Sequence, residues 1–116
     1  MPAANQIDYI EFQASDLEAT KAFFEQLFGW QFTDYGPDYT SFTDGRIAGG
    51  FTRSALCSTP DSGGVLVVFY HPEIEEMQRR VGKLGGRVTR EVFSFPGGRR
   101  FQFTEPSGNE CAVWSE

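Results

Sequence analysis

The sequence predicts an α+β fold in which two tandem β-α-β-β-β units form a cupped mixed sheet with helices on its outer face. The segment from Asp16 to Trp30 matches the segment from Glu73 to Arg87, with apolar residues and a closing glycine at equivalent positions. Each segment follows a strand-like apolar run and precedes three further runs of the same kind. Two such units should close around a pseudo-two-fold axis and leave a cavity there.

Length and composition indicate one domain over residues 1–116, with repeats at approximately 5–56 and 64–116. A chain of 116 residues is long enough for one core but not for two. The loop-like stretch 58–64 separates the repeats and acts as a hinge between halves. Aromatic residues make up 16% of the chain and include twelve Phe, so we expect much of the inner surface to be aromatic.

The formal charge of −6 argues against a nucleic-acid partner, because binding to a phosphate backbone needs clustered Lys and Arg. An acidic surface mildly favours cationic ligands. The longest apolar run, residues 65–70, is too short to span a bilayer. The N-terminus has neither a basic start nor an apolar stretch, and Cys57 and Cys111 form no metal or disulfide pattern, so we expect a cytoplasmic protein without membrane contact.

The first unit begins with a strand over residues 7–14, in which side chains alternate between two faces. The more apolar of these faces should pack under the helices. Ser15 or Asp16 can cap the helix that follows. Its apolar residues recur at helical spacing, and Gly29 ends it.

Three strands complete the first unit. A short strand begins at Trp30 and is followed by turn residues over 34–38. The segment 39–52, with Asp44-Gly45 at its centre, gives the clearest hairpin signal in the chain, because Asp-Gly favours a tight turn between antiparallel strands.

The second unit repeats this order. The apolar strand 65–70 leads into a helix that starts around His71-Pro72-Glu73, where proline suits an early helical position. Apolar residues recur along the helix at helical spacing, and Gly85-Gly86 ends it. Three closing strands follow, over residues 87–93, 99–104 and 109–114.

These motifs resemble those of the vicinal oxygen chelate superfamily, which includes glyoxalase I, bleomycin resistance proteins, fosfomycin-modifying enzymes and extradiol dioxygenases. The matching stretches are the strand and helix from Tyr9 to Trp30, the hairpin from Tyr39 to Phe51, and Phe103-Thr104-Glu105-Pro106-Ser107-Gly108-Asn109. The last stretch resembles the family signature F-x-D-P-x-G-N. The resemblance covers the whole chain and implies the fold, but one fold hosts many chemistries.

The resemblance also implies where a metal would sit. Metal-using relatives hold a divalent ion at the axis with His, Gln or Glu from the first strand of each repeat and the final strand, and sometimes from the fourth. The equivalent positions here are Tyr9, Leu66, Ala112 and Gly49. A divalent centre needs several oxygen or nitrogen donors, and only the tyrosine offers one. We therefore predict a protein with no metal and no other cofactor.

Strand alternation extends these positions to a predicted cavity lining of aromatic and aliphatic walls with one or two carboxylates. Glu11 is the candidate for a ligand anchor or a general base, and its alternative is a solvated carboxylate or one paired with Arg46. Glu110 is the second carboxylate. The predicted ligand-binding residues are Tyr9, Glu11, Ile47, Phe51, Leu66, Val68, Tyr70, Glu110 and Trp114.

Three functions fit this pattern. The first is a metal-free protein that binds a small hydrophobic or aromatic molecule, cationic ones included. The second is an isomerase or lyase, related to lactoylglutathione lyase, that acts on a small carbonyl compound with Glu11 as acid or base, or with metal if the ligand positions are assigned wrongly. The third is an accessory module whose own aromatics close the pocket. Family members usually pair, so we expect a homodimer; the cup could form within one chain or between two.

Overall fold

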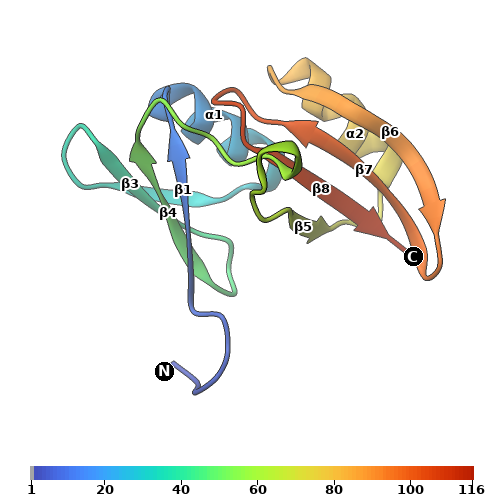
Figure 1. Ribbon diagram of the computed structural model, residues 1–116, viewed down its shortest axis with the longest axis horizontal. Helices are drawn as coiled ribbons and strands as arrows, with labels where there is room; N and C mark the ends of the chain where they lie inside the picture. The colour runs from blue at the N-terminus through green and yellow to red at the C-terminus, as the bar shows by residue number, and fades with distance from the viewer. Residues whose placement is uncertain (1) are drawn as a thin grey trace.

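The structure is a computed structural model that describes residues 2–116, and it contains two β-α-β-β-β units in tandem (Figure 1). The elements of the first unit are β1 (Tyr9–Ala14), α1 (Leu17–Phe28), β2 (Gln31–Asp34), β3 (Tyr39–Thr43) and β4 (Ala48–Arg53). A short 3₁₀ helix, η1 (Pro60–Ser62), connects the units. The second unit contains β5 (Val67–Tyr70), α2 (Ile74–Lys83), β6 (Arg87–Phe95), β7 (Gly98–Thr104) and β8 (Glu110–Ser115).

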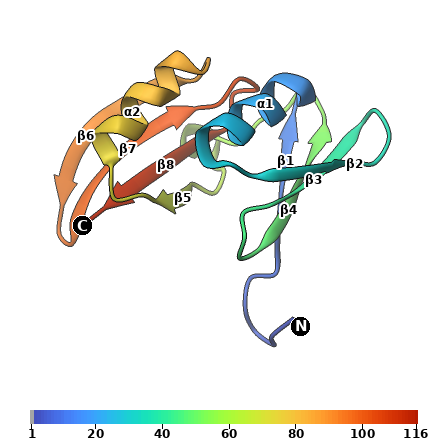
Figure 2. The same cartoon turned by 180° about the vertical axis from the view of Figure 1, so that it is seen from behind.

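Each unit forms its own four-stranded mixed sheet. Sheet A has the order β1-β4-β3-β2, and sheet B has the equivalent order β5-β8-β7-β6. In both sheets the first strand pairs parallel with the last strand of the unit, and the remaining pairs are antiparallel. The two helices cover one side of the paired sheets and leave the other side open (Figures 1 and 2). The predicted α+β fold with two tandem units is confirmed.

Helix α1 begins and ends where the sequence predicts. The carboxylate of Asp16 accepts a hydrogen bond from the backbone N–H of Ala19 and so caps the first turn. Gly29 closes the helix in the left-handed conformation, at φ 74°, which glycine adopts without a steric penalty. The buried stripe of the helix comprises Leu17, Thr20, Phe23, Phe24 and Leu27. Among residues 2–116 no helix is long and apolar enough to cross a membrane.

Helix α2 buries Ile74, Met77 and Val81 of the predicted apolar stripe, while Leu84, the fourth residue of that stripe, is half-buried just after the helix. The other faces of α2 are mostly charged. Arg80 of this helix reaches across to α1, where its guanidinium donates to the backbone carbonyls of Gln26 and Leu27. These carbonyls belong to the last turn of α1 and have no partner within that helix. The contact therefore joins the two helices and satisfies the C-terminal end of α1.

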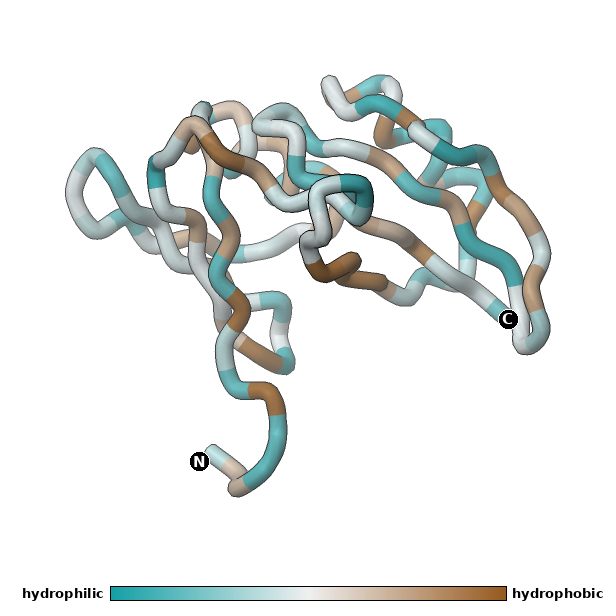
Figure 3. Tube along the Cα trace, in the orientation of Figure 1, coloured by the Kyte–Doolittle hydropathy of each residue, from teal (hydrophilic) through white to brown (hydrophobic). Residues whose placement is uncertain are grey.

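The core is a single aromatic cluster built from both units. The ring of Trp30 stacks on Phe42 at 4.3 Å and on Phe24 at 4.6 Å between centroids. Phe69 of β5 packs against Phe28 at 4.8 Å, so an aromatic side chain of the second unit lies in the core of the first. Figure 3 shows the hydrophobic segment that leads into β5 beside η1, and Val65 in this segment is exposed. Strand β5 accordingly begins at Val67, two residues later than predicted.

A buried polar cluster also joins the units. The Glu105 carboxylate accepts hydrogen bonds from the Thr20 hydroxyl at 2.6 Å, the Ser107 backbone N–H at 2.7 Å and the Asn109 side-chain amide at 2.6 Å. Asn109 also donates to the backbone carbonyl of Gln13 in β1, at 2.8 Å. The signature-like stretch near the C-terminus is thus a structural joint between β1, α1 and β8.

Candidate functional site

Two open sheet faces, away from the helices, carry most of the predicted site residues. In sheet A, strand alternation sends Phe12 and Ala14 into the core and leaves Tyr9 and Glu11 on the open face. Tyr9 is 44% exposed. The predicted orientation of β1 is therefore correct, and these two side chains lie on a solvent-facing surface of the chain.

A group of hydrogen-bonded side chains surrounds Glu11. Its two carboxylate oxygens accept from the Thr52 hydroxyl at 2.9 Å and, at a long 3.5 Å, from the Tyr39 hydroxyl. The hydroxyls of Tyr39 and Tyr9 also share a hydrogen bond. We call Tyr9, Glu11, Tyr39 and Thr52 the tyrosine cluster. It brings one carboxylate, two phenols and two aromatic rings to a single place on β1, β3 and β4.

Gly50 makes room for this cluster. It pairs with Glu11 in the β1–β4 register and with Ser41 in the β3–β4 register, so it lies at the centre of the open face. A Cβ atom at this position would overlap the Tyr39 hydroxyl and lie 2.7 Å from the Tyr9 hydroxyl. Any other residue at position 50 would therefore displace the phenols from the surface they occupy.

Tyr39 holds its proton strongly. Burial, followed by the hydrogen bond to Tyr9 and the nearby charge of Glu11, raises the pKa of Tyr39 above its ordinary value near 10. The phenol therefore stays neutral at physiological pH and can donate to Glu11 or to an acceptor on a ligand. Chemically, the tyrosine cluster can bind a cation or an aromatic ring, or hold and return a proton.

The structure corrects the placement of Phe51, which the sequence analysis put on the inner face. Its side chain is fully buried on the helix side, where the ring stacks on Phe12 at 5.1 Å. The reason is the register, since Glu11 pairs with Gly50 and not with Phe51. Ile47 is half-buried in the turn before β4 and is not part of the strand.

Sheet B presents a different open face. Val68 pairs with Ala112, and Tyr70 pairs with Trp114, so these predicted residues share the face away from the helices. The rings of Tyr70 and Trp114 meet edge to face at 5.1 Å, and the Tyr70 hydroxyl donates to Glu116 at 2.6 Å, which raises the pKa of Tyr70. Leu66 precedes β5 and is half-buried.

An open hollow of about 630 Å³ lies on sheet B beside η1. Strands β6 and β7 contribute Arg87, Thr89, Arg90, Gln102 and Thr104, and Glu110 enters from β8. One Glu110 oxygen accepts from the Thr89 hydroxyl at 3.0 Å and from the Gln102 amide at 2.9 Å. Glu110 is the only residue of the predicted lining that borders this hollow.

The predicted lining thus divides into three groups: Tyr9 with Glu11, Tyr70 with Trp114 beside Val68, and Glu110 in the hollow. No hydrogen bond or ring contact links these groups across the two sheets in residues 2–116. Sequence reasoning missed Tyr39, Thr52, Arg87 and Arg90. The hairpin centred on Asp44-Gly45 carried a usable signal for two of them, since it pairs Tyr39 with Thr52.

The donor set does not fit the metal that the fold implies. The residues at the equivalent positions are Tyr9, Leu66, Ala112 and Gly49, and Gly49 moreover faces the helix side. Across residues 2–116 no three His, Cys, Asp or Glu side chains lie close enough together to hold an ion. Glu11 and Glu110 belong to different sheets. A divalent ion at this axis would lack the oxygen and nitrogen ligands it needs.

The side chains of His71 and Cys111 have structural roles. His71 accepts a hydrogen bond through Nδ1 from the backbone N–H of Glu73, at the entry to α2. Cys111 is fully buried on the helix side of β8, and burial raises the pKa of its thiol. A buried neutral thiol is a poor nucleophile.

Comparison with known proteins gives one family and one fold. A family model described as the Glyoxalase/Bleomycin resistance protein/Dioxygenase superfamily matches residues 6–113. No curated protein matches the chain in sequence.

Similar solved structures include the fosfomycin resistance protein FosX from Listeria monocytogenes, with a TM-score of 0.81 and 15% identity over 98% of this chain and 95% of that one. Lactoylglutathione lyase from Agrobacterium tumefaciens gives a TM-score of 0.73 and 21% identity over 98% and 96%. The hypothetical protein SA1046 from S. aureus gives 0.77 and 14% over 98% and 100%. At these identities the likeness extends to the fold alone.

Proposed function

Because the chain belongs to the glyoxalase/bleomycin resistance protein/dioxygenase superfamily, in which one fold carries several chemistries, we propose that this member binds a small hydrophobic or aromatic molecule without a metal. The tyrosine cluster is the observation that carries the proposal. It places two phenol rings beside a carboxylate on an exposed sheet face, where a structural role would not require them.

The chemistry of the cluster favours an aromatic ligand that carries a positive charge. Tyrosine rings offer a π face for stacking and for cation–π contact, and Glu11 supplies the opposite charge. Thr52 and Tyr39 hold the Glu11 side chain against the sheet, so little conformational freedom is lost when a ligand binds. The net charge of −6 favours the approach of a cation.

A charge series on one ring tests this preference. Benzylammonium, benzyl alcohol and benzoate share a benzyl-sized body and differ in charge, and ¹⁵N NMR titration reports both affinity and location. We expect benzylammonium to bind most tightly and to shift the amides of residues 9–11, 39–41 and 50–52. Glu11→Gln should remove the advantage of benzylammonium over benzyl alcohol, because it removes the charge and keeps the shape.

Glu25→Gln is the matched control, since Glu25 is an exposed glutamate of α1 far from the open face. It should leave the charge preference unchanged. Equal affinity for all three probes, or equal loss in both variants, would contradict the proposal.

The second candidate is an isomerase or lyase that acts on a small carbonyl compound. The contact between the Tyr39 hydroxyl and Glu11 supports it, because a carboxylate beside a neutral phenol can take a proton and return one. Activity on such a substrate should be lost in Glu11→Gln together with the acidic limb of the pH–rate profile. An unchanged profile in that variant would exclude Glu11 as the base.

We also propose a homodimer that works in the cytoplasm. Tyr70 and Val68 expose 49% and 41% of their surface on the open face of sheet B, which leaves an apolar surface for a second copy. Cys57 and Cys111 are both free thiols, as is usual in a reducing compartment. Sedimentation velocity checks the dimer, and a monomer across the micromolar range would contradict it.

A further inference from the structure

We propose that the hollow on sheet B is an oxyanion-binding site, in which Arg87 and Arg90 bind a carboxylate or phosphate-type group of a small molecule. This goes beyond the proposed function, because the hollow shares no residue with the tyrosine cluster and selects the opposite charge.

The first observation is that these arginines lack ion-pair partners in a chain rich in carboxylates. The protein carries 16 acidic and 10 basic residues. Within residues 2–116, Arg53, Arg79 and Arg99 each form an ion pair with a carboxylate, whereas Arg87 and Arg90, like Arg46, Arg80 and Arg100, form none within 4.0 Å. Their charges are therefore available to a ligand.

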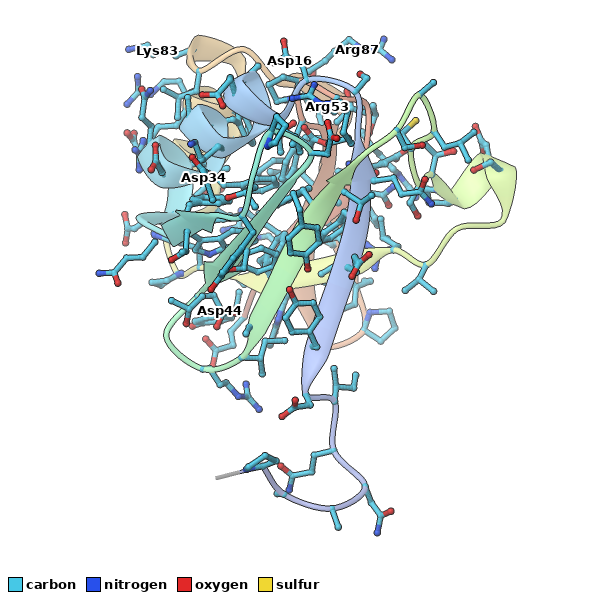
Figure 4. The ribbon with its side chains drawn as sticks, turned by 90° about the vertical axis from the view of Figure 1, so that its left-hand side faces the viewer. Asp16, Asp34, Asp44, Arg53, Lys83 and Arg87 are labelled. Atoms are coloured by element: carbon cyan, nitrogen blue, oxygen red, sulfur yellow. The ribbon has the colours of Figure 1, made fainter. Side chains whose placement is uncertain are left out.

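The second observation is the register of β6, β7 and β8. Arg87 pairs with Thr104, and Thr104 pairs with Glu110; one row further along, Arg90 pairs with Gln102. The two cations thus lie along β6, on one side of the hollow, while Glu110 lies two strands away on β8. Figure 4 shows the Arg87 side chain extending outward at one end of the molecule.

The third observation is that the neighbours of Arg90 hold its guanidinium in place. The group lies 3.6 Å from the centroid of the Phe93 ring, and Arg100 approaches the same ring at 5.5 Å. The Nε atom of Arg100 is buried and lacks a hydrogen-bond partner, while its terminal nitrogen donates to Gln102. Two guanidinium groups, those of Arg90 and Arg100, therefore lie around one ring.

Two carboxylates border the hollow, Glu110 and, from η1, Asp61, and in residues 2–116 neither forms an ion pair with Arg87 or Arg90 within 4.0 Å. The Oε2 atom of Glu110 accepts hydrogen bonds from Thr89 and Gln102, which hold this carboxylate against its own side of the hollow. The Thr104 hydroxyl makes no hydrogen bond with another side chain in the described part of the chain, so it can donate to a bound oxyanion.

A planar guanidinium binds the oxygens of a carboxylate or phosphate in pairs, and two guanidiniums with a hydroxyl donor suit such a group. The ligand class is a small molecule with an exposed oxyanion. Long nucleic acids are disfavoured by the net charge of −6.

The test is an NMR titration of the full chain with inorganic phosphate and, separately, with acetate, at constant ionic strength set by sodium chloride. We expect saturable shifts at the amides of residues 87–90 and 102–104. The probe with the higher affinity identifies the oxyanion as phosphate-type or carboxylate. Arg87→Gln and Arg90→Gln should each weaken binding roughly tenfold, because each removes a charge-assisted hydrogen-bond donor.

Two control variants separate binding in the hollow from attraction to general surface charge. Arg46→Gln changes an exposed arginine in the β3–β4 turn and should leave phosphate binding unchanged. Glu110→Gln should tighten binding several-fold, because it removes a negative charge that borders the hollow at nearly constant shape.

Shifts that do not saturate, or that chloride reproduces, would overturn the proposal. Equal weakening in Arg46→Gln would overturn it as well, since it would indicate attraction to general surface charge. Failure of the benzylammonium titration would leave this result unaffected, because none of the arginines belongs to the tyrosine cluster.

Discussion

Single residues decide what each open face can bind. In sheet A, the absent side chain of Gly50 allows the hydroxyls of Tyr9 and Tyr39 to meet above the strand, next to Glu11. In sheet B, Arg87 and Arg90 lie on the open face, and neither has an ion-pair partner in residues 2–116. The open face of sheet A therefore presents a carboxylate beside two phenols, whereas that of sheet B presents two guanidiniums together with the Glu110 carboxylate.

Tyr39 should make stability depend on alkaline pH. Its folded-state pKa lies above the unfolded value near 10, so the neutral phenol contributes stability that is complete below pH 10 and is lost as pH rises above it. The loss cannot exceed about 1.4 kcal/mol per pH unit for one group. Urea unfolding at pH 9 and pH 11 measures it.

The comparison that isolates this effect is Tyr39→Phe. Cys111 and Tyr70 also have raised pKa values and add to the alkaline slope of both proteins. The difference between wild type and Tyr39→Phe therefore reports Tyr39 alone, and we expect the variant to lose less stability between the two pH values. Identical slopes would show that the Tyr39 phenol is not buried as described.

At the scale of elements, helix α2 is the weaker of the two helices by its own sequence. It has no side-chain cap at its N-terminus, and Gly82 lies in its last turn. A Cβ atom at Gly82 would meet nothing within 4 Å, and the residue has an ordinary helical φ. The glycine lowers helix stability without serving a contact.

Gly82→Ala should raise the free energy of unfolding by about 0.5–1 kcal/mol, the usual difference between Gly and Ala in a helix interior. Gly85→Ala is the opposing control. Gly85 has φ 101°, which a residue with a Cβ atom adopts only with strain, so this variant should lose about 1 kcal/mol or more. Chemical denaturation compares them, and two changes of the same sign would contradict the assignment.

At the scale of the whole molecule, the two units form one body because aromatic and polar contacts cross between them. Phe69 of the second unit packs on Phe28 of the first, and Arg80 of α2 satisfies the end of α1. Glu105 and Asn109 bond to Thr20 and Gln13 across the same junction. We therefore expect a single cooperative unfolding transition.

Asn109→Ala should weaken this junction. The variant leaves the Ser58 backbone N–H, the Gln13 carbonyl and the Glu105 carboxylate each without one buried partner, at a total cost of about 3 kcal/mol. Urea denaturation measures it. Ser94→Ala, which changes an exposed polar residue of β6, should cost little, and an equal effect of the two substitutions would contradict the role of the joint.

The metal prediction also belongs to the whole molecule, because an axial site would need ligands from both units. We expect the Tm measured with added Zn²⁺, Mn²⁺ or Ni²⁺ to equal the Tm measured with EDTA. A metal at 100 times its Kd would stabilise the folded state by about 2.7 kcal/mol, which a thermal melt detects readily. A saturable rise in Tm would show that the donor positions are assigned wrongly.

Local sequence patterns were enough to predict the order of elements and most of their ends. Alternation in β1 predicted which face carries Tyr9 and Glu11, and Asp16 and Gly29 predicted the ends of α1. These features depend on interactions between residues only a few positions apart, so the sequence of one strand or helix is enough to predict them. The internal repeat then predicted the second unit from the first.

Which residues share a surface depends on long-range strand pairing and packing. The parallel register of β1 and β4 placed Gly50 opposite Glu11 and Phe51 in the core, and a one-residue shift of this kind exchanges the two faces of a strand. Tyr39 joined the site, and Arg87 and Arg90 lined a hollow, through pairings that span many residues. Such pairings depend on packing between distant strands, which local sequence patterns do not specify.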